Sequence, residues 1–229
     1  MTMTLTKQIE FTDVMKQFKK YVSKKDTRLK YVYFDHSGYF VGTDSHKLLR
    51  VHSDYISNIP EGVEIGSLIN PETLEINSQL RFPATNELIP DYTNIDIELN
   101  RKNIKELQDG LKQLRPIYKK FENKVVKMEI RRDKTILSSE YERMIIFSDK
   151  TNKVETIREQ VTINNFYSDR EDFTIYFNGD YLNNALITVK KLDKLTDDQT
   201  IIGFIGELRP IIIRKKGIFD ILILPVRVF

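Results

Sequence analysis

Cysteine is absent from the 229 residues, and glycine and proline are few, with 9 and 7 residues. Without cysteine the chain has no disulfide, no zinc–thiolate site and no thiol nucleophile, which excludes a disulfide-stapled secreted domain and fits a reducing cytoplasm. Hydrophobic residues make up 40% and aromatic residues 10%. This composition is typical of an ordered chain and argues against disorder or low complexity.

Long hydrophobic runs are missing too. The run over residues 218–226 contains Asp220 and is much shorter than the roughly 20 residues of a membrane-spanning helix. Residues 1–11 lack the basic start, apolar stretch and cleavage site of a secretion signal. We therefore expect a cytoplasmic protein without a membrane partner.

The common catalytic motifs are also lacking: there is no phosphate-binding glycine-rich loop, no G-x-G-x-x-G, no G-x-S-x-G and no H-E-x-x-H. One group of polar residues could in principle hold a divalent metal, namely His36, Asp44, His46, His52 and Asp54. Their spacing matches no metal signature, which favours ordinary surface or hydrogen-bonding roles. We expect no metal, no cofactor and no enzyme activity, and keep a metal-dependent nuclease built on Asp44 and His46 as the minor alternative.

Hydrophobic periodicity predicts three helices. They cover residues 13–24 with Thr12 as N-cap, residues from 101 to a kink or end at Pro116 with Asn100 as N-cap, and residues 178–189 starting at Asn178. Short β-segments follow each helix, and the turn 214–217 predicts a hairpin near the end of the chain. A helix followed by antiparallel strands thus occurs twice, which predicts an α+β fold with two related domains, residues 1–96 and 97–229.

Positive charge is clustered although the net charge is only +3. Residues 16–30 contain seven basic side chains and one acid, and residues 101–134 contain twelve basic side chains and five acids. Each cluster covers a helix, and its lysines lie off the apolar stripe, so each predicted domain presents one basic face. Lysine-rich helix faces are often plain solvated surface, but two matched faces also suit sequence-independent contact with nucleic-acid phosphates.

Four short segments resemble the bacterial sliding clamp, the β subunit of DNA polymerase III. G-T-D-S-H-K-L at residues 42–48 is similar to the clamp's A-T-D-G-H-R-L, and I-P-D-Y at 89–92 is similar to F-P-D-Y. F-N-G-D-Y-L at 177–182 resembles F-N-x-x-Y-L, and L-P-V-R-V at 224–228 resembles the terminal M-P-M-R-L. The four segments follow one another in the same order as in the clamp family. By this resemblance residues 11–229 correspond to the second and third of the clamp's three domains, and the first domain has no counterpart.

The resemblance implies clamp-like domains, each an antiparallel sheet with one or two helices on the side that faces double-stranded DNA. The residues expected to face the DNA are Lys16, Lys19, Lys20, Lys24, Lys105, Lys112, Arg115, Lys119, Lys190 and Lys191. It also implies a hydrophobic pocket between the domains for short peptides of the replicative polymerase, the clamp loader and repair proteins. The expected pocket residues are Thr43, His46, Lys47, Leu48, Pro90, Ile95, Leu222, Leu224, Pro225, Val226 and Arg227.

The sequence departs from the family at several positions. Ser45 and Lys47 replace the usual Gly and Arg, and Asn94 stands where a basic residue is common. Residues 53–97, which four prolines interrupt, are short for the full set of strands and the second helix of a clamp domain, so the first domain is predicted to be trimmed.

The function that the resemblance predicts is that of a DNA sliding clamp, a processivity factor that catalyses no bond change. Six domains in a ring would require three copies of this chain. The alternative is a clamp-derived protein that does not encircle DNA and binds or sequesters the tails of replication proteins. A composition rich in Ile, Lys and Asn is typical of a low-GC bacterium or its phage, and a phage or plasmid origin fits a short clamp variant.

Overall fold

The computed structural model describes residues 7–77, 81–120, 124–146, 152–168, 172–193 and 199–228. Its elements up to residue 98 are β1 (Ile9–Glu10), α1 (Phe11–Phe18), β2 (Val32–Phe34), β3 (Tyr39–Thr43), β4 (Lys47–His52), η1 (Ser53–Tyr55), β5 (Ile56–Ser57), β6 (Leu68–Ile69), β7 (Ile76–Asn77), η2 (Asn86–Leu88) and β8 (Ile95–Glu98). The elements that follow are α2 (Arg101–Tyr118), β9 (Val125–Ile130), β10 (Thr135–Ile146), β11 (Asn152–Ile163), β12 (Phe173–Asn178), α3 (Gly179–Leu192), β13 (Ile201–Phe204), β14 (Ile211–Lys215) and β15 (Phe219–Ile223). The predicted α+β class is confirmed.

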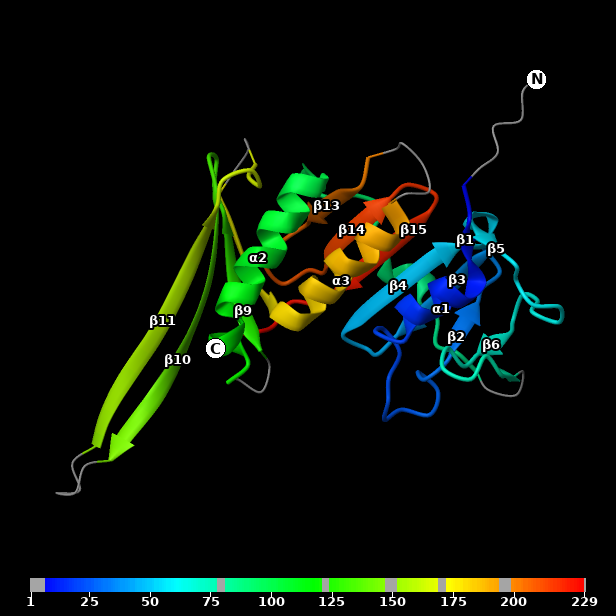
Figure 1. Ribbon diagram of the computed structural model, residues 1–229, viewed down its shortest axis with the longest axis horizontal. Coiled ribbons are helices and arrows are strands. Elements are labelled where there is room, and N and C mark those ends of the chain that lie inside the picture. The colour runs from blue at the N-terminus through cyan, green and yellow to red at the C-terminus, as the bar shows by residue number, and fades with distance from the viewer. Residues whose placement is uncertain are drawn as a thin grey trace.

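Two antiparallel sheets organise the molecule (Figure 1). The larger has nine strands in the order β7-β6-β2-β3-β4-β15-β14-β13-β8, and the smaller has four in the order β11-β10-β9-β12. In addition, β1 and β5 form a short parallel pair. The predicted domain boundary after residue 96 falls within β8, which pairs with β13. Strands from both sides of that boundary are joined in the larger sheet, where β4 pairs with β15, and the division into two domains stays a prediction.

The nine-stranded sheet has two different faces because side chains alternate along each strand. Phe40, Leu49 and Ile221 belong to the main core, which α1 and α3 cover. Leu48 and Leu222 point to the other face and form a smaller apolar cluster. One close approach fixes a glycine: a Cβ on Gly42 would lie 2.8 Å from the Phe18 ring, so the contact of α1 with β3 requires a residue without a side chain.

The helices α2 and α3 lie side by side, with α2 over the four-stranded sheet (Figure 1). The leucines of the predicted stripe, Leu107, Leu111 and Leu114, are all buried. Gly110 brings α2 close to the sheet, since a Cβ there would lie 3.1 Å from the side chain of Ile163.

The predicted N-cap Asn100 is confirmed, and Asn178, where the third helix was predicted to begin, is the N-cap of α3. The Asn100 side chain accepts hydrogen bonds from the backbone N–H groups of residues 102 and 103, and the Asn178 side chain accepts them from residues 180 and 181. Pro116 does not end α2, which continues to Tyr118, although proline has no N–H to donate to the carbonyl four residues earlier.

The first helix was predicted incorrectly at both ends. It begins at Phe11 without a side-chain cap, so Thr12 is not the N-cap, and it ends at Phe18 instead of residue 24. After Phe18, hydrogen bonds between backbone groups close in sequence form turns instead of a further helical turn. The Ser23 hydroxyl then accepts a hydrogen bond from the Asp26 N–H, and the chain leaves the direction of α1. Between residues 53 and 97 the described part contains three two-residue strands, β8 and two single-turn 3-10 helices, but no α-helix.

Candidate functional site

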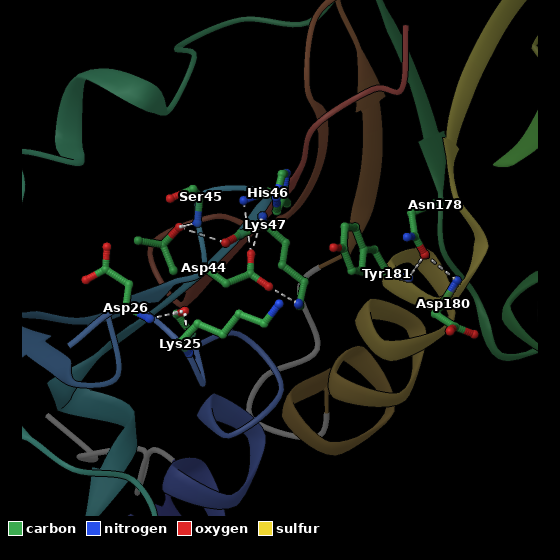
Figure 2. A network of polar contacts seen from close by, with 11 residues as sticks. Lys25, Asp26, Asp44, Ser45, His46, Lys47, Asn178, Asp180 and Tyr181 are labelled. Carbon is green, nitrogen blue, oxygen red and sulfur yellow. Dashed lines mark hydrogen bonds and ion pairs between the residues drawn. The ribbon is translucent and has the colours of Figure 1, made fainter. Parts of the chain in front are cut away.

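The turn between β3 and β4 is held by its own side chains (Figure 2). The Asp44 carboxylate accepts hydrogen bonds from the N–H groups of His46 and Lys47, each at 3.0 Å. The Thr43 hydroxyl donates to the Lys47 carbonyl at 2.8 Å and accepts from the Ser45 N–H. Ser45 has φ of +74°, in the left-handed region that glycine adopts at least cost. This geometry explains why the related motif has glycine at this position.

Lys47 joins the turn to α3. Its ammonium forms an ion pair with Asp44 and lies 4.3 Å from the centre of the Tyr181 ring, and its side chain is only 7% exposed. The His46 ring stacks on the same tyrosine at 6.2 Å between centroids, and the His46 carbonyl accepts a hydrogen bond from the Leu224 N–H at 2.9 Å. The turn, the first turn of α3 and the end of β15 therefore meet at one place.

A groove of about 420 Å³ opens beside this meeting point, on the side where Leu48 and Leu222 face. We call it the turn groove. Six of its lining residues are among the predicted pocket residues: Thr43, His46, Lys47, Leu48, Leu222 and Leu224. Sequence reasoning missed nine others: Asp26, Arg28, Leu29, Ser45, Pro83, Ala84, Thr85, Leu88 and Pro210.

The turn groove is mainly apolar, with charge at its rim. Leu88 and Leu224 line it and are 55% and 41% exposed, so part of its apolar lining faces solvent. The charged rim comes from Asp26 and Arg28, in the loop after α1. The Asp26 carboxylate accepts hydrogen bonds from two backbone N–H groups of that loop, which hold its pKa below the ordinary value. Such a groove suits an extended peptide that carries apolar side chains.

Five predicted pocket residues lie outside the lining of the turn groove. Past β15 the chain runs along β12, where Pro225 faces Phe177 and the Val226 N–H donates to the Tyr176 carbonyl, and Arg227 follows exposed. The Pro90 carbonyl accepts from Arg214, beside a polar pocket on the same sheet. Ile95 is buried in β8 and pairs with Phe204. Their roles in peptide binding stay predictions.

Nine of the ten residues expected to face DNA lie on the three helices or within two residues of their ends, and Lys24 lies in the loop after α1. All are exposed except Lys20, which is half-buried. Burial lowers the pKa of Lys20, and the positive charge of Lys191 lowers it further, so the end of α1 lies near the end of α3. Lys190 of α3 in turn donates a hydrogen bond to Gln108 of α2. The cationic side chains of the three helices therefore belong to neighbouring surfaces.

A metal site has no support within the described ranges, where no group of three His, Asp or Glu side chains could hold an ion. Asp44 is already engaged by two N–H groups and by Lys47, and the His52 ring accepts a hydrogen bond from the Asp54 N–H. The described helices also include none that is long and apolar enough to cross a membrane.

Solved structures of bacterial clamps superpose on this chain. The β chain of DNA polymerase III from Streptococcus pneumoniae has a TM-score of 0.64 at 20% identity, over 95% of this chain and 63% of that one. The fold is that of a bacterial sliding clamp.

Other clamps give the same result. The Bacillus subtilis clamp has a TM-score of 0.62 at 21% identity, and the Helicobacter pylori β clamp bound to a DNA ligase peptide has 0.60 at 13%. Both comparisons cover 95% of this chain, which spans only 63% of the length of either clamp. No profile of a known protein family matches the sequence, and neither does any curated protein.

Proposed function

We propose that this protein is a DNA sliding clamp, a processivity factor that encircles duplex DNA and tethers a replicative polymerase through the turn groove. The observation that carries the proposal is the turn groove itself. It is lined by residues 43, 45–48, 222 and 224, which belong to or adjoin the two clamp-like motifs farthest apart in the sequence, in a chain with the clamp fold.

The turn groove is suited to bind a short protein tail. Leu48, Leu222 and Leu224 offer apolar contact, and each buried methylene of a peptide contributes about 0.8 kcal/mol. Arg28 and Asp26 at the rim can pair with polar groups of the peptide. A polymerase held this way stays at a high local concentration on its template, which raises processivity without any bond chemistry. A clamp loader would use the same groove.

The basic helix faces suit contact with the phosphate backbone. Lysines on α1, α2 and α3 carry no arrangement that reads bases, so their attraction to DNA is independent of sequence and weakens with salt. A ring needs head-to-tail contacts between copies that complete a full rotation. With two clamp domains per chain, a six-domain ring contains three copies.

Retention on DNA tests the proposal. The protein is dissociated in concentrated salt, dialysed together with a nicked circular plasmid and separated from free protein by gel filtration. A clamp elutes with the circle and is released when a restriction enzyme linearises the plasmid, because it slides off the ends. The native mass before loading should be that of a trimer.

Two results would contradict encirclement. A stable monomer at micromolar concentration is incompatible with a closed ring. Equal retention on circular and linear DNA would show plain surface binding. Peptide binding in the turn groove without retention on the circle would favour the alternative, a clamp-derived protein that binds or sequesters the tails of replication proteins.

A further inference from the structure

A second pocket opens on the face of the nine-stranded sheet that points away from the main core. One row of side chains crosses this face through paired strands: Arg50 of β4 lies opposite Asp220 of β15, and Asp220 lies opposite Arg214 of β14. All three line a pocket of about 530 Å³. We call it the arginine pocket.

The carboxylate in the middle of this row is shared by two guanidinium groups. The Asp220 side chain is only 6% exposed, and it accepts hydrogen bonds from the Nε–H groups of Arg50, at 2.6 Å, and of Arg214. Two cations and one anion leave the row with one positive charge in excess. A partly buried cation without a full counter-charge is an anchoring point for an anionic ligand.

Both arginines keep hydrogen-bond donors that the protein does not use. The Arg214 Nη2 donates to the Pro90 carbonyl at 2.9 Å, but within the described part of the chain its other terminal nitrogen has no acceptor. The Arg50 guanidinium lies 4.5 Å from the centre of the Tyr39 ring, and among the same residues neither of its terminal nitrogens has an acceptor. The ring and the Nε–H bond hold this guanidinium in place, so its free N–H groups are ready for a planar carboxylate.

The rest of the lining limits the charge of the ligand. Lys216, Asp91 and Asp96 complete the charged residues of the pocket, and all three are exposed. A phosphate group, or a nucleic-acid backbone with its repeated charges, would be repelled by the two acids. A single carboxylate instead matches the one excess positive charge of the buried row.

The arginine pocket and the turn groove lie on the same face and share two strands. Leu48 and Leu222 line the turn groove, whereas Arg50 and Asp220, each two residues away on the same strand, line the arginine pocket. Residues two apart in a strand are separated by about 7 Å. One extended ligand can therefore reach both sites.

A single connecting segment, residues 83–93, also runs past both sites. Residues 83–85 and 88 line the turn groove, and residues 91–93 line the arginine pocket. In between, Ile89 is buried in the smaller apolar cluster. An extended chain advances about 3.3 Å per residue, so a path around this segment needs roughly three to six residues.

We propose that the arginine pocket is a second binding site, which takes one carboxylate from an aspartate or glutamate of the protein tail whose apolar residues occupy the turn groove. The carboxylate accepts hydrogen bonds from the unused N–H groups of Arg50 and Arg214. Tyr92, which lines the pocket and is 67% exposed, offers apolar contact to the neighbouring residues of the tail. The inference rests on the proposed function, because it adds a feature to the tail that the turn groove binds.

A set of fluorescent peptides tests the arginine pocket on the wild-type protein. Each peptide carries the apolar residues of a bacterial polymerase tail and one glutamate, placed at one of the six positions before or after them. A reference peptide has glutamine at all of these positions. At one position glutamate should bind about tenfold more tightly than glutamine by fluorescence anisotropy, because hydrogen bonds to a charged acceptor are the stronger ones.

The peptides also separate the two proposals. If the reference peptide binds but glutamate is preferred at no position, the arginine pocket is overturned and the turn groove stands. If no peptide binds, including the reference, both proposals are overturned. Neither result depends on a folded variant.

The variant Arg50→Gln assigns the preference to this pocket. It removes the free donors of Arg50 and leaves Asp220 paired with Arg214, so the fold should be kept. The preference for glutamate should disappear, whereas the reference peptide should bind as to the wild type, because Arg50 does not line the turn groove. A glutamate preference that survives in Arg50→Gln would overturn the proposal.

Arg101→Gln is the matched control for the loss of charge. Arg101 is an exposed arginine on α2 that lines neither the turn groove nor the arginine pocket. This variant should keep the full preference for glutamate. An equal loss of preference in both variants would show a general effect of net charge and would also overturn the proposal.

Discussion

The ammonium of Lys47 lies over the ring of Tyr181, with 4.3 Å between Nζ and the ring centroid, although 133 residues separate them in the sequence. Lys47 begins β4, and Tyr181 stands in the first turn of α3. Because the same lysine pairs with Asp44 in the β3–β4 turn, it fixes the turn against the helix. The wall of the turn groove therefore depends on a contact between the two parts of the chain.

Replacing Lys47 by Met should lower the free energy of unfolding by about 1–3 kcal/mol, because Asp44, only 15% exposed, loses its cation. The methionine keeps the length of the side chain and its apolar packing. Lys16→Met is the matched control: its pair with Asp13 has the same spacing, but the two side chains are 63% and 55% exposed, so solvent screens the pair and its loss should change stability much less. Urea unfolding measures both variants, and equal losses would contradict the role of Lys47.

Truncation of Leu224 tests the turn groove. Its side chain lines the groove and is 41% exposed. Leu224→Ala should therefore weaken the binding of a fluorescent peptide from a bacterial polymerase tail by about tenfold and leave the fold intact. Val228→Ala is the control, since Val228 is 57% exposed and does not line the groove. Fluorescence anisotropy measures both affinities. Unchanged binding by Leu224→Ala would remove the turn groove as the peptide site.

Local signals in the sequence predicted the fold best. The caps Asn100 and Asn178 act within their own chain neighbourhood, and the hairpin of β14 and β15 needs only its turn. The end of α1 was wrong because tertiary and side-chain contacts decide it: apolar spacing continues past Phe18 to Tyr21, but the backbone there forms tight turns. The short β-segments expected after the second helix include two strands of 12 residues, β10 and β11, because no pattern in the sequence shows how far the two strands pair with each other.

The part of the turn groove that the sequence indicates best is the part built by neighbouring residues of one motif. Thr43 to Leu48 form one turn, and the motif that contains them marks the wall that they build. Pro83 and Pro210 reach the groove from loops without periodicity, so only the folded chain brings them to it. At the end of the chain, Leu224 lines the turn groove, but Pro225 already lies beside Phe177 of β12, outside the groove.

Charge reversal on α2 tests contact with DNA. Lys112 is exposed on α2, and Lys112→Glu should weaken binding to duplex DNA of any sequence and reduce the slope of log affinity against log salt by about 1. Lys216→Glu changes the net charge equally, but Lys216 borders a pocket with Tyr39 and Arg50 on the sheet face away from the helices. Affinities at several salt concentrations compare the two variants. Equal effects would indicate a general effect of net charge instead of a DNA-facing helix.

Tyr118 should make the stability depend on pH in the alkaline range. Burial raises the pKa of its phenol, and the nearby Asp180 carboxylate, which accepts its hydrogen bond, raises it further, to about 12. The ordinary value is about 10, so the folded state keeps a proton that the unfolded chain releases. The stabilisation is complete below about pH 10 and is lost as the pH rises towards 12.

The variant Tyr118→Phe isolates this contribution, because phenylalanine cannot ionise. The urea midpoint should fall less between pH 9 and pH 11 for Tyr118→Phe than for the wild type. The other titratable groups are the same in both proteins, so the difference between the two falls reports the phenol of Tyr118. Asp180→Asn should show an intermediate fall, because the charge at Asp180 is gone while the burial of Tyr118 remains. If the wild type and Tyr118→Phe lose the same stability between the two pH values, the phenol is not held in its protonated form by the fold.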